Sequence, residues 1–417
     1  MRILGRQFVM GRTIEEALAR ADAGERHGYR PSYDMLGEAA RTAADAASYH
    51  AAYRHAIDRI GAAAGGRPIA EAPGISVKLS ALHPRYEPAQ RDRAMRELLP
   101  RLVDLCRAAR DARVGLTVDA EEADRLELSL DLFKALALDP ALSGWDGLGL
   151  AVQAYQKRAM TIIDWLADLA ARSGHRLMVR LVKGAYWDSE IKRAQERGLD
   201  SYPVFTRKVA TDVSYLACAR RLFAAGAAIY PQFATHNAHT LSAIIELAGE
   251  RKDWEFQRLH GMGEALYDEV VEPMKRPCRV YAPVGNHEAL LAYLVRRLLE
   301  NGANTSFVNR LVDERQPIDV IVADPVAQLA QLAVKPHPRI ALPRDVFQPS
   351  RVNSSGLDLA DRQSLAELQA GLAAALQLPA AAGRSSPGSK QQAPPPLSSI
   401  PPIAGARLAR RVSPIPI

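Results

Sequence analysis

Four short apolar runs of this sequence carry polar or charged residues at alternate positions. In the run GISVKL, which begins at Gly74, Ser76 and Lys78 share one parity. Successive side chains of a β-strand point to opposite faces, so the apolar positions should pack against helices and leave Lys78 on the inner face. The same parity places these residues of the next three runs inside: Thr117, Asp119, Gln153, Tyr155, Met178, Arg180 and Val182. Because buried charges are costly and collect at functional sites, these runs predict a catalytic site. The alternative is a structural polar plug with internal ion pairs such as Asp119 with Lys78.

A second candidate group lies in the segment 287–302. Tyr293, Arg296, Arg297 and Glu300 follow one another at spacings of three and four and therefore share one side of a helix. Two adjacent arginines beside core leucines form a double fork that suits a carboxylate. The alternative is a solvated helix face with an Arg296–Glu300 pair.

Two weaker patterns suggest other chemistry. The run THNAH contains His236 and His239, but no carboxylate motif accompanies it, which disfavours a metal site. Lys183 stands near the end of an apolar run, where a lysine also suits Schiff-base formation as in an aldolase. An aldolase using Lys78 or Lys183 is therefore the main enzymatic alternative.

The elements that must position these residues alternate between β-type and helical patterns. We expect strands at 29–36, 74–82, 115–121, 147–155, 176–183, 230–236, 256–261 and 279–284. Helical candidates between them include 91–112, 161–172, 189–226, 240–249 and 287–302. Eight strands, each followed by room for a helix, predict an α/β fold of the (β/α)8 barrel type. An open doubly wound sheet is disfavoured because no GxGxxG opens the first strand–helix turn.

Composition places the chain among globular proteins. It has 417 residues, of which 48% are hydrophobic, and no run approaches the roughly 18 apolar residues of a membrane span. The N-terminus lacks a signal-peptide pattern, which predicts a cytoplasmic protein. Cys106, Cys218 and Cys278 lie far apart without a CxxC, so we expect inert, mostly buried thiols.

The basic charge of the chain is concentrated in its C-terminal tail. The net charge is +7, of which +5 comes from the acid-free stretch 383–417 with Arg384, Lys390, Arg407, Arg410 and Arg411. The other residues carry only +2, which argues against a nucleic-acid-binding domain. From about residue 379 onward the sequence is rich in Pro, Ser and Ala without periodicity, which predicts a disordered segment.

Longer motifs resemble a known family. They are SYDMLGEAA, GISVKLSALHPRY, DAEEADRLELSLDL, QAYQKR, RLVKGAYWDSEIKRAQ, YPQFATHNAHT, LHGMGE, RVYAPVG and AYLVRRLLENGANTSFVNR. Together, from about residue 7 to 325, they resemble the proline dehydrogenase domain of bifunctional proline utilization A (PutA). The resemblance implies a helical lead-in at 1–28, a barrel at 29–325, a linker at 326–378 and a tail at 379–417.

The resemblance also implies roles for individual residues. Arg296, Arg297 and Lys78 resemble the cations that hold the proline carboxylate, and Asp119 and Arg180 resemble the catalytic pair, with Arg180 donating to flavin N5. Glu38 resembles a gate residue that pairs with an arginine when the site closes. The apolar walls around the proline ring match Tyr186, Leu259, Tyr281 and Tyr293. Flavin contacts match Ala120, Gln153, Arg180, Val182, Lys183, Gly184, Ala185, Trp187, Thr206, Thr235 and His236.

The implied reaction is hydride transfer from C5 of L-proline to N5 of FAD, giving Δ1-pyrroline-5-carboxylate. The family passes the electrons to membrane ubiquinone, so contact with the inner face of the membrane is left open, and no metal is implied. The family's DNA-binding module has no match here. Of its aldehyde dehydrogenase domain only HPRIALPRDVF and NSSGLDLADR resemble the lead-in, so a second dehydrogenase activity is not expected from this chain. A non-catalytic remnant barrel without flavin is the remaining alternative.

Overall fold

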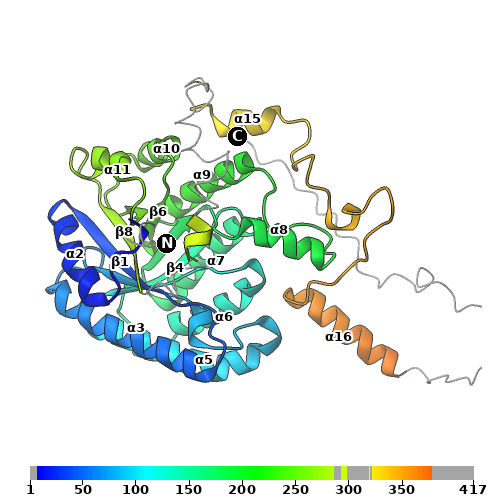
Figure 1. The fold of residues 1–417 in the computed structure, drawn as a ribbon, viewed down its shortest axis with the longest axis horizontal. Helices are drawn as coiled ribbons and strands as arrows, with labels where there is room; N and C mark the ends of the chain where they lie inside the picture. The colour runs from blue at the N-terminus through cyan, green and yellow to red at the C-terminus, as the bar shows by residue number, and fades with distance from the viewer. Residues whose placement is uncertain (1–6, 286–292, 298–318, 320–321, 378–417) are drawn as a thin grey trace, which may run out of the picture. The chain divides into compact units, whose positions relative to one another are not determined.

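Eight parallel strands close into a barrel, each strand pairing with the next along the chain and the last with the first (Figure 1). They are β1 (Tyr29–Met35), β2 (Gly74–Val77), β3 (Gly115–Val118), β4 (Leu148–Gln153), β5 (Leu177–Val182), β6 (Ile229–Ala234), β7 (Glu255–Leu259) and β8 (Cys278–Val284). The barrel closes where Tyr29 of β1 stands opposite Cys278 of β8. The predicted (β/α)8 fold is therefore confirmed.

This computed structural model describes residues 7–285, 293–297, 319 and 322–377. It divides into two units, Met1–Leu357 and Asp358–Ile417. Within the described part of the second unit, α16 (Arg362–Leu376) begins at Asp361, whose carboxylate accepts from the Ser364 amide.

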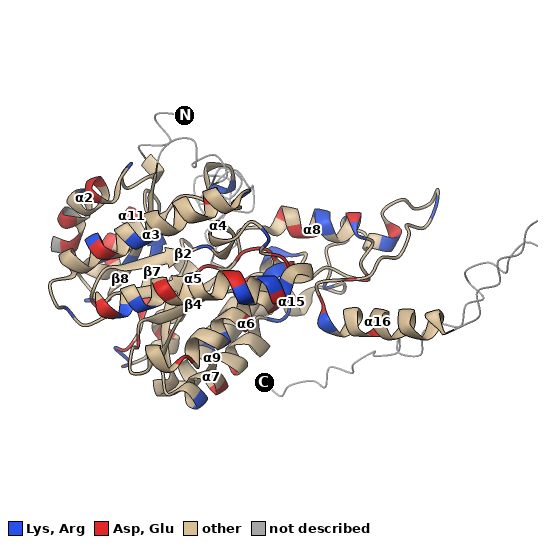
Figure 2. Cartoon of the chain, turned by 90° about the horizontal axis from the view of Figure 1, so that it is seen from below, with Lys and Arg blue, Asp and Glu red and all other residues tan. Residues whose placement is uncertain are grey.

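Helices follow the strands along the chain, and their apolar residues form the core with the strands. They are α2 (Ile14–Arg26), α3 (Ala43–Ala64), α4 (Leu79–Leu82), α5 (Arg91–Asp111), α6 (Leu126–Ala137), α7 (Ala159–Ser173), α8 (Trp187–Glu196), α9 (Lys208–Ala224), α10 (Ala238–Ala248), α11 (Glu264–Val271) and α15 (Pro325–Gln331). Short 3-10 turns lie at Pro88–Gln90, Ala123–Arg125, Pro140–Leu142, Gly226–Ala228 and Pro343–Asp345. On α5 the buried residues Leu98, Leu102, Leu105 and Ala109 recur at helical spacing and pack into this core. Figure 2 shows charges of both signs interspersed along helices such as α8.

Several expected strands end earlier than predicted, among them the one expected at 115–121, which ends at Val118, and one expected helix is interrupted. The strand expected at 74–82 ends at Val77, because the chain turns into α4 directly after Lys78. The helix expected at 189–226 is two helices, since α8 ends before Gly198, which has a φ of +60°. Pro203 in the connection also lacks the amide hydrogen that a continuous helix needs.

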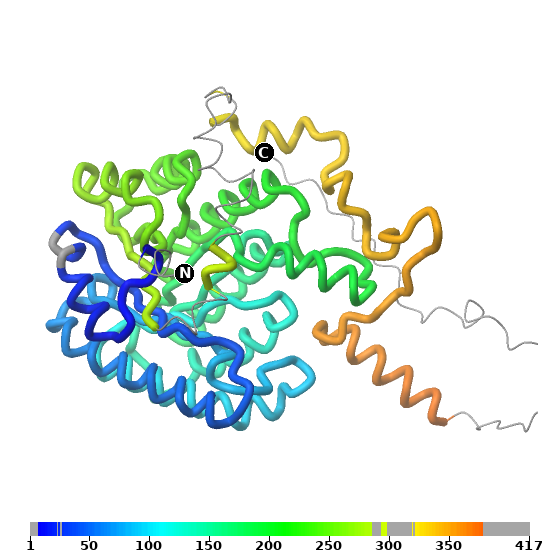
Figure 3. Tube along the Cα trace, viewed as in Figure 1, coloured from blue at the N-terminus to red at the C-terminus, as the bar shows by residue number. Residues whose placement is uncertain are grey.

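The described residues 322–357 run along the barrel's own helices (Figure 3). Arg207, at the start of α9, donates to the carbonyl oxygens of Val334, Lys335 and Pro336 at 3.0–3.3 Å. Further along, the Gly356 amide donates to the Gly198 carbonyl at 2.9 Å. The segment from Val334 to Gly356 is thus fixed to α8, α9 and the loop between them.

Two chemical expectations concern side chains away from the strand ends. All three cysteines are buried, as predicted, and burial raises the pKa of the Cys218 thiol to about 11. Among the described residues, no group of three or more His, Cys, Asp or Glu side chains is arranged to hold a metal ion. Nor does any described helix combine the length and the apolar character that crossing a membrane requires.

Candidate active site

Lys78 lies at the centre of a buried charge cluster. It directly follows β2, and its side chain is only 7% exposed. Its Nζ donates to Asp34 Oδ1 at 2.7 Å, to Asp119 Oδ2 at 3.2 Å and to the Tyr281 hydroxyl at 3.1 Å. Burial alone would lower the pKa of Lys78, but the charges of Asp34 and Asp119 raise it well above its usual value. Lys78 is therefore a fixed ammonium inside the barrel.

Arg180 occupies the opposite side of Asp119. From β5, its Nη1 donates to Asp119 Oδ1 at 2.7 Å, its Nε to Gln257 Oε1 at 2.7 Å and its Nη2 to Ser76 Oγ at 2.8 Å. All three donor directions of the guanidinium are thus satisfied by groups from three other strands or strand ends, which fixes its plane.

Asp119 joins the two cations. Burial acts to raise the pKa of Asp119, but the charges of Lys78 and Arg180 outweigh that effect and lower it. The Tyr281 hydroxyl donates to the same carboxylate at 2.7 Å, and Arg180 lies over the Tyr281 ring with 5.2 Å to its centroid. Asp119 therefore remains ionised and orients both cations.

Asp34, which is fully buried on β1, was not among the inward-facing residues predicted from the sequence. Strand parity would have found it, because Ser32 and Asp34 occupy alternate positions of β1 and pair in register with Gly74 and Ser76 of β2. Burial raises the pKa of Asp34, against the opposing effect of Lys78. Asp34 is a further carboxyl group that contacts Lys78 directly.

Parity held for the strands and failed just beyond one of them. Thr117 and Met178 both face Gly149 inside the barrel, where a Cβ would meet the Thr117 hydroxyl at 2.8 Å. Tyr155, expected inside, lies past the end of β4 and packs instead in a separate cluster with Ile191 and Tyr202. One residue past the strand end the alternation still held for Lys78 and Asp119, whereas two residues past the end of β4 it failed for Tyr155.

The arginine pair is also buried. Arg296 donates from Nη1 and Nη2 to the two carboxylate oxygens of Glu38 at 2.7 and 2.9 Å and lies over the Tyr186 ring. Arg297 is 7% exposed and lies over the Tyr293 ring. Neither guanidinium lies on a solvated face. Glu300, the partner in the alternative interpretation, lies outside the described residues, as does most of the helix expected at 287–302.

Glu38 links the two groups of charges. Burial acts to raise its pKa, but Arg296, followed by Lys78, lowers it. The charge of Lys78 thus acts on the carboxyl group that holds Arg296. Tyr281 contacts Lys78 and Asp119 and also packs in the apolar cluster that contains Tyr293, over which Arg297 lies, so the strand-end cluster and the arginine pair adjoin in one site.

Three of the four expected wall residues fall in one apolar cluster. Leu259 and Tyr281 pack against buried Tyr293, and the cluster is completed by Phe8, Val9, Leu36, Met262 and Leu294. Tyr186 lies beneath Arg296 instead. The contribution of Phe8 and Val9 from the N-terminal segment had no sequence pattern to indicate it.

The positions matched to flavin contacts lie at or after the carboxyl ends of β3 to β6: Ala120 follows β3, Gln153 ends β4, and Arg180 and Val182 lie in β5. Lys183 follows β5 and pairs with Asp212 at 2.5 Å, and Thr235 and His236 follow β6. Thr206 accepts a hydrogen bond from the His337 amide at 2.9 Å, and the Trp187 indole donates to the Phe205 carbonyl at 2.8 Å. Gly184, which directly follows Lys183, has a φ of +134°, and a Cβ there would lie 2.5 Å from the Tyr155 ring.

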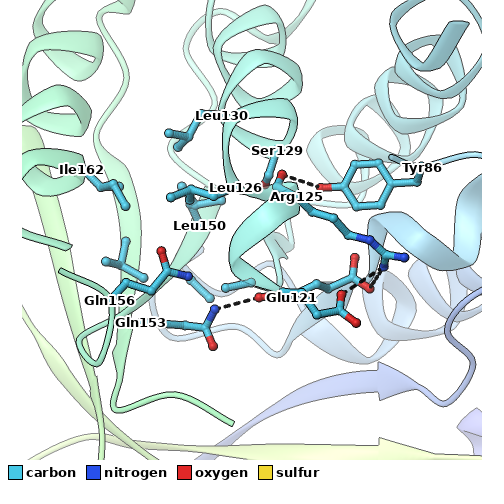
Figure 4. A pocket seen from close by; sticks show the side chains of 14 residues that line it. Tyr86, Glu121, Arg125, Leu126, Ser129, Leu130, Leu150, Gln153, Gln156 and Ile162 are labelled. Atoms are coloured by element: carbon cyan, nitrogen blue, oxygen red, sulfur yellow. Dashed lines mark hydrogen bonds and ion pairs between the residues drawn. The ribbon is translucent and has the colours of Figure 1, made fainter. Parts of the chain in front are cut away.

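A small hollow lies beside this site, between the loop after β3, the strand β4 and the helices α6 and α7 (Figure 4). Glu121 lies on its wall, and Gln153 donates to the Glu121 carbonyl at 2.8 Å. Burial raises the pKa of Glu121 to about 7. This carboxyl group had not been singled out from the sequence, although it stands two residues after Asp119.

A closed parallel barrel with buried charges at the carboxyl ends of its strands has the architecture of a (β/α)8 enzyme. The family model described as proline dehydrogenase matches residues 17–310. Bifunctional protein PutA from Klebsiella aerogenes is 61% identical over 386 residues, covering 89% of this chain and 29% of that protein. PutA from Escherichia coli K12 is 58% identical over 411 residues, covering 93% and 31%.

Solved structures agree with these matches. A crystal structure of a PutA variant from Bradyrhizobium japonicum superposes with a TM-score of 0.84 at 54% identity, covering 90% of this chain and 38% of that one. The chain therefore belongs to the proline dehydrogenase family, and its resemblance to the proline dehydrogenase domain of PutA is confirmed. It spans about three tenths of the length of the PutA relatives it matches.

Proposed function

We propose that this chain oxidises L-proline to Δ1-pyrroline-5-carboxylate with FAD as its cofactor. The observation that carries the proposal is the buried cluster of Lys78, Asp119, Arg180 and Tyr281, joined electrostatically to Glu38 and Arg296. Such a cluster offers fixed cations to a small zwitterion and an aromatic wall to its ring.

The substrate carboxylate is assigned to the cations. Arg297 and Arg296 supply planar guanidinium forks, and Lys78 supplies an ammonium whose pKa the neighbouring carboxylates raise well above its usual value. The ring of proline would then lie against Leu259, Tyr281 and Tyr293, which already form an apolar cluster. Binding by both ends fixes the orientation of C5.

Asp119 is assigned a positioning role by its electrostatics. A carboxyl group whose pKa is lowered by two cations is a weak base. Its contribution is to hold Lys78 for the substrate carboxylate and Arg180 for the cofactor. The proton of the proline amine therefore leaves to water or to a group other than Asp119.

The connections after β5 and β6 supply groups that suit FAD. Gly184 allows the Tyr155 ring to pack directly against the loop backbone after β5, and the ammonium of Lys183 with the hydroxyls of Thr206 and Thr235 supplies donors for phosphate and ribityl oxygens. FAD, when bound, supplies the acceptor for the hydride from C5 of proline. Arg180 would hold the flavin ring edge by a donated hydrogen bond.

The aldolase alternative is disfavoured by the same electrostatics. A Schiff-base lysine must present a neutral amine, whereas the pKa of Lys78 is raised. Lys183 is held in an ion pair with Asp212.

The family resemblance further supports a cytoplasmic location, a quinone such as ubiquinone as electron acceptor and contact with the membrane surface.

One experiment separates the proposed function from its alternatives. The purified chain should be yellow, with flavin absorbance at ~450 nm. L-proline should bleach that absorbance and reduce an artificial electron acceptor. An aldolase or a remnant barrel would be colourless. A yellow protein that L-proline does not reduce would exclude proline as the substrate while leaving the flavin site intact.

A further inference from the structure

Glu121 is a buried carboxyl group with no role in the reaction as described above. It is 8% exposed and follows Asp119 by two residues. Both of its oxygens accept from Ser80: Oε2 from the Ser80 amide at 3.1 Å, and Oε1 from the Ser80 hydroxyl. Since Ser80 lies in α4, directly after β2, these bonds tie the end of β3 to the end of β2.

Ser80 is also hydrogen-bonded to the loop after β1. The Ala39 amide donates to Ser80 Oγ at 3.0 Å, and the Ala40 amide donates to the Ser80 carbonyl at 2.9 Å. Ala39 has a φ of +53°, a left-handed conformation that a non-glycine residue adopts only when its surroundings hold it there. The two bonds to Ser80 fix the backbone on both sides of the Ala39–Ala40 peptide.

This backbone determines the position of Glu38. Glu38 directly precedes Ala39, and both of its carboxylate oxygens accept from Arg296, at 2.7 and 2.9 Å. A bidentate pair tolerates little displacement of either partner. A shift of Ala39 out of its left-handed conformation would therefore move the Glu38 carboxylate away from Arg296.

We propose that Glu121 is a positioning residue that acts through Ser80 on the Ala39 backbone to hold Glu38 against Arg296. It thereby couples the strand end that carries Asp119 to the ion pair beside the arginine pair. This inference rests on the proposed function, in which Arg296 and Arg297 bind the substrate carboxylate. Glu121 itself contacts neither Lys78 nor Arg180 in any hydrogen bond or ion pair of the described residues.

The test is a double-mutant cycle on the full, flavin-loaded chain, with KM for L-proline and kcat as readouts. Glu121→Gln keeps the shape of the side chain but replaces one acceptor oxygen with a donor, so the Ser80 amide and the Ser80 hydroxyl can no longer both donate to it. We expect KM to rise roughly 3- to 10-fold, the effect of one hydrogen bond, with a smaller change in kcat. In a Glu38→Ala background the same substitution should change KM less than about 2-fold, because its target is already gone.

Glu190→Gln is the matched control. Glu190 is equally buried, and burial raises its pKa to about 7 as well, but it accepts from the Ala123 amide rather than from Ser80. It should leave KM within about 2-fold of the unmodified chain. Ser80→Ala removes the hydroxyl shared by Glu121 and Ala39, and should reproduce the effect of Glu121→Gln if that variant does not fold.

Three results would overturn the inference. They are an unchanged KM in both Glu121→Gln and Ser80→Ala, an increase of the same size with and without Glu38, and an equal increase in Glu190→Gln. If the unmodified chain does not oxidise proline, the proposed function fails separately. A crystal structure of Ser80→Ala then decides, and an intact Glu38–Arg296 pair over an unchanged Ala39 would refute the positioning role.

Discussion

In this site, contacts between opposite charges offset the free-energy cost of burying charged side chains inside the barrel. Lys78 lies between Asp34 and Asp119, and Arg180 donates to Asp119, Gln257 and Ser76. Removing one member of such a group leaves an uncompensated buried charge, which costs about 3–5 kcal/mol. Substitutions at the centre of the cluster therefore confound binding with stability, so the clearest tests use residues at its edge.

Arg297→Met should raise KM for L-proline roughly 10- to 150-fold while flavin stays bound, since one charged hydrogen bond to a ligand contributes about 1.5–3 kcal/mol. Steady-state kinetics and the flavin absorbance of the purified variant check both parts. The control is Arg172→Met, on α7, where the arginine is 46% exposed and pairs with Asp168. An unchanged KM in Arg297→Met, with only a small loss of thermal stability, would refute the carboxylate assignment.

Glu190 should make stability fall between about pH 4.5 and 7. Burial raises its pKa from 4.5 to about 7, so the folded state keeps the proton after the unfolded state has lost it. The stabilisation is fully present below pH 4.5 and is lost as pH rises to 7, by roughly 3 kcal/mol at most. Unfolding free energies of the unmodified chain and of Glu190→Gln, compared at pH 5 and pH 7.5, measure it. Parallel pH profiles for the two proteins would contradict the assignment.

At the scale of elements, the connections after the strands decide whether strand-end residues reach the site. The chain turns into α4 directly after Lys78, and a capping box begins α3, with the Asp45 amide donating to Thr42 Oγ1 and the Thr42 amide to Asp45 Oδ2. The capping box fixes the end of the Glu38 loop that leads into α3, and Ser80 of α4 is hydrogen-bonded to the middle of that loop. The connection after β5 depends on a glycine instead.

Gly184→Ala should reduce the flavin content of the purified protein. The new Cβ would lie 2.5 Å from the Tyr155 ring in a backbone conformation with φ of +134°, so the loop with Lys183 and Ala185 must shift. Gly144→Ala is the matched control, because its φ is +76° and nothing lies within 4 Å of the added Cβ. Equal flavin content in the two variants would show that the loop after β5 does not line the cofactor site.

At the scale of the whole molecule, residues beyond the barrel complete its surface. Within the first unit, the amide of His337 donates to Thr206, Arg207 donates to three carbonyl groups of residues 334–336, and Tyr202 donates to the Ala341 carbonyl. Gly356 approaches so closely that a Cβ would lie 1.8 Å from the Arg197 carbonyl oxygen. The segment 334–356 therefore supports α8 and α9 from outside the barrel.

Two truncations should have opposite outcomes. Removing residues 383–417 should leave flavin content and proline turnover unchanged, because that stretch has neither periodicity nor a motif residue. Ending the chain after Ala333 should lower flavin content, since Thr206 and Arg207 lose their partners. Absorbance per mole of protein and turnover with an artificial acceptor measure both. A large loss in the shorter truncation would assign a packing role to the tail.

The sequence alone determined the barrel and its inward charges, because strand periodicity is local. Alternation within each run was enough to direct Lys78, Asp119 and Arg180 inward, and the count of runs was enough for a closed sheet. The long motifs identified the family, which the comparisons confirmed. Alternation failed at Tyr155, which lies two residues beyond the end of β4, whereas Lys78 and Asp119 lie only one residue beyond the ends of β2 and β3.

Only the tertiary structure decided which groups meet across the barrel. Asp34 and Lys78 are 44 residues apart, and Glu38 and Arg296 are 258 apart. Their contact depends on the register between neighbouring strands and on the closure of β8 against β1, which no local pattern contains. The same is true of Glu121, which acts on Ser80 only because β2 and β3 are neighbours and their ends turn toward each other. The periodicity of a strand determines the face on which each side chain lies, whereas strand pairing determines which side chains come into contact.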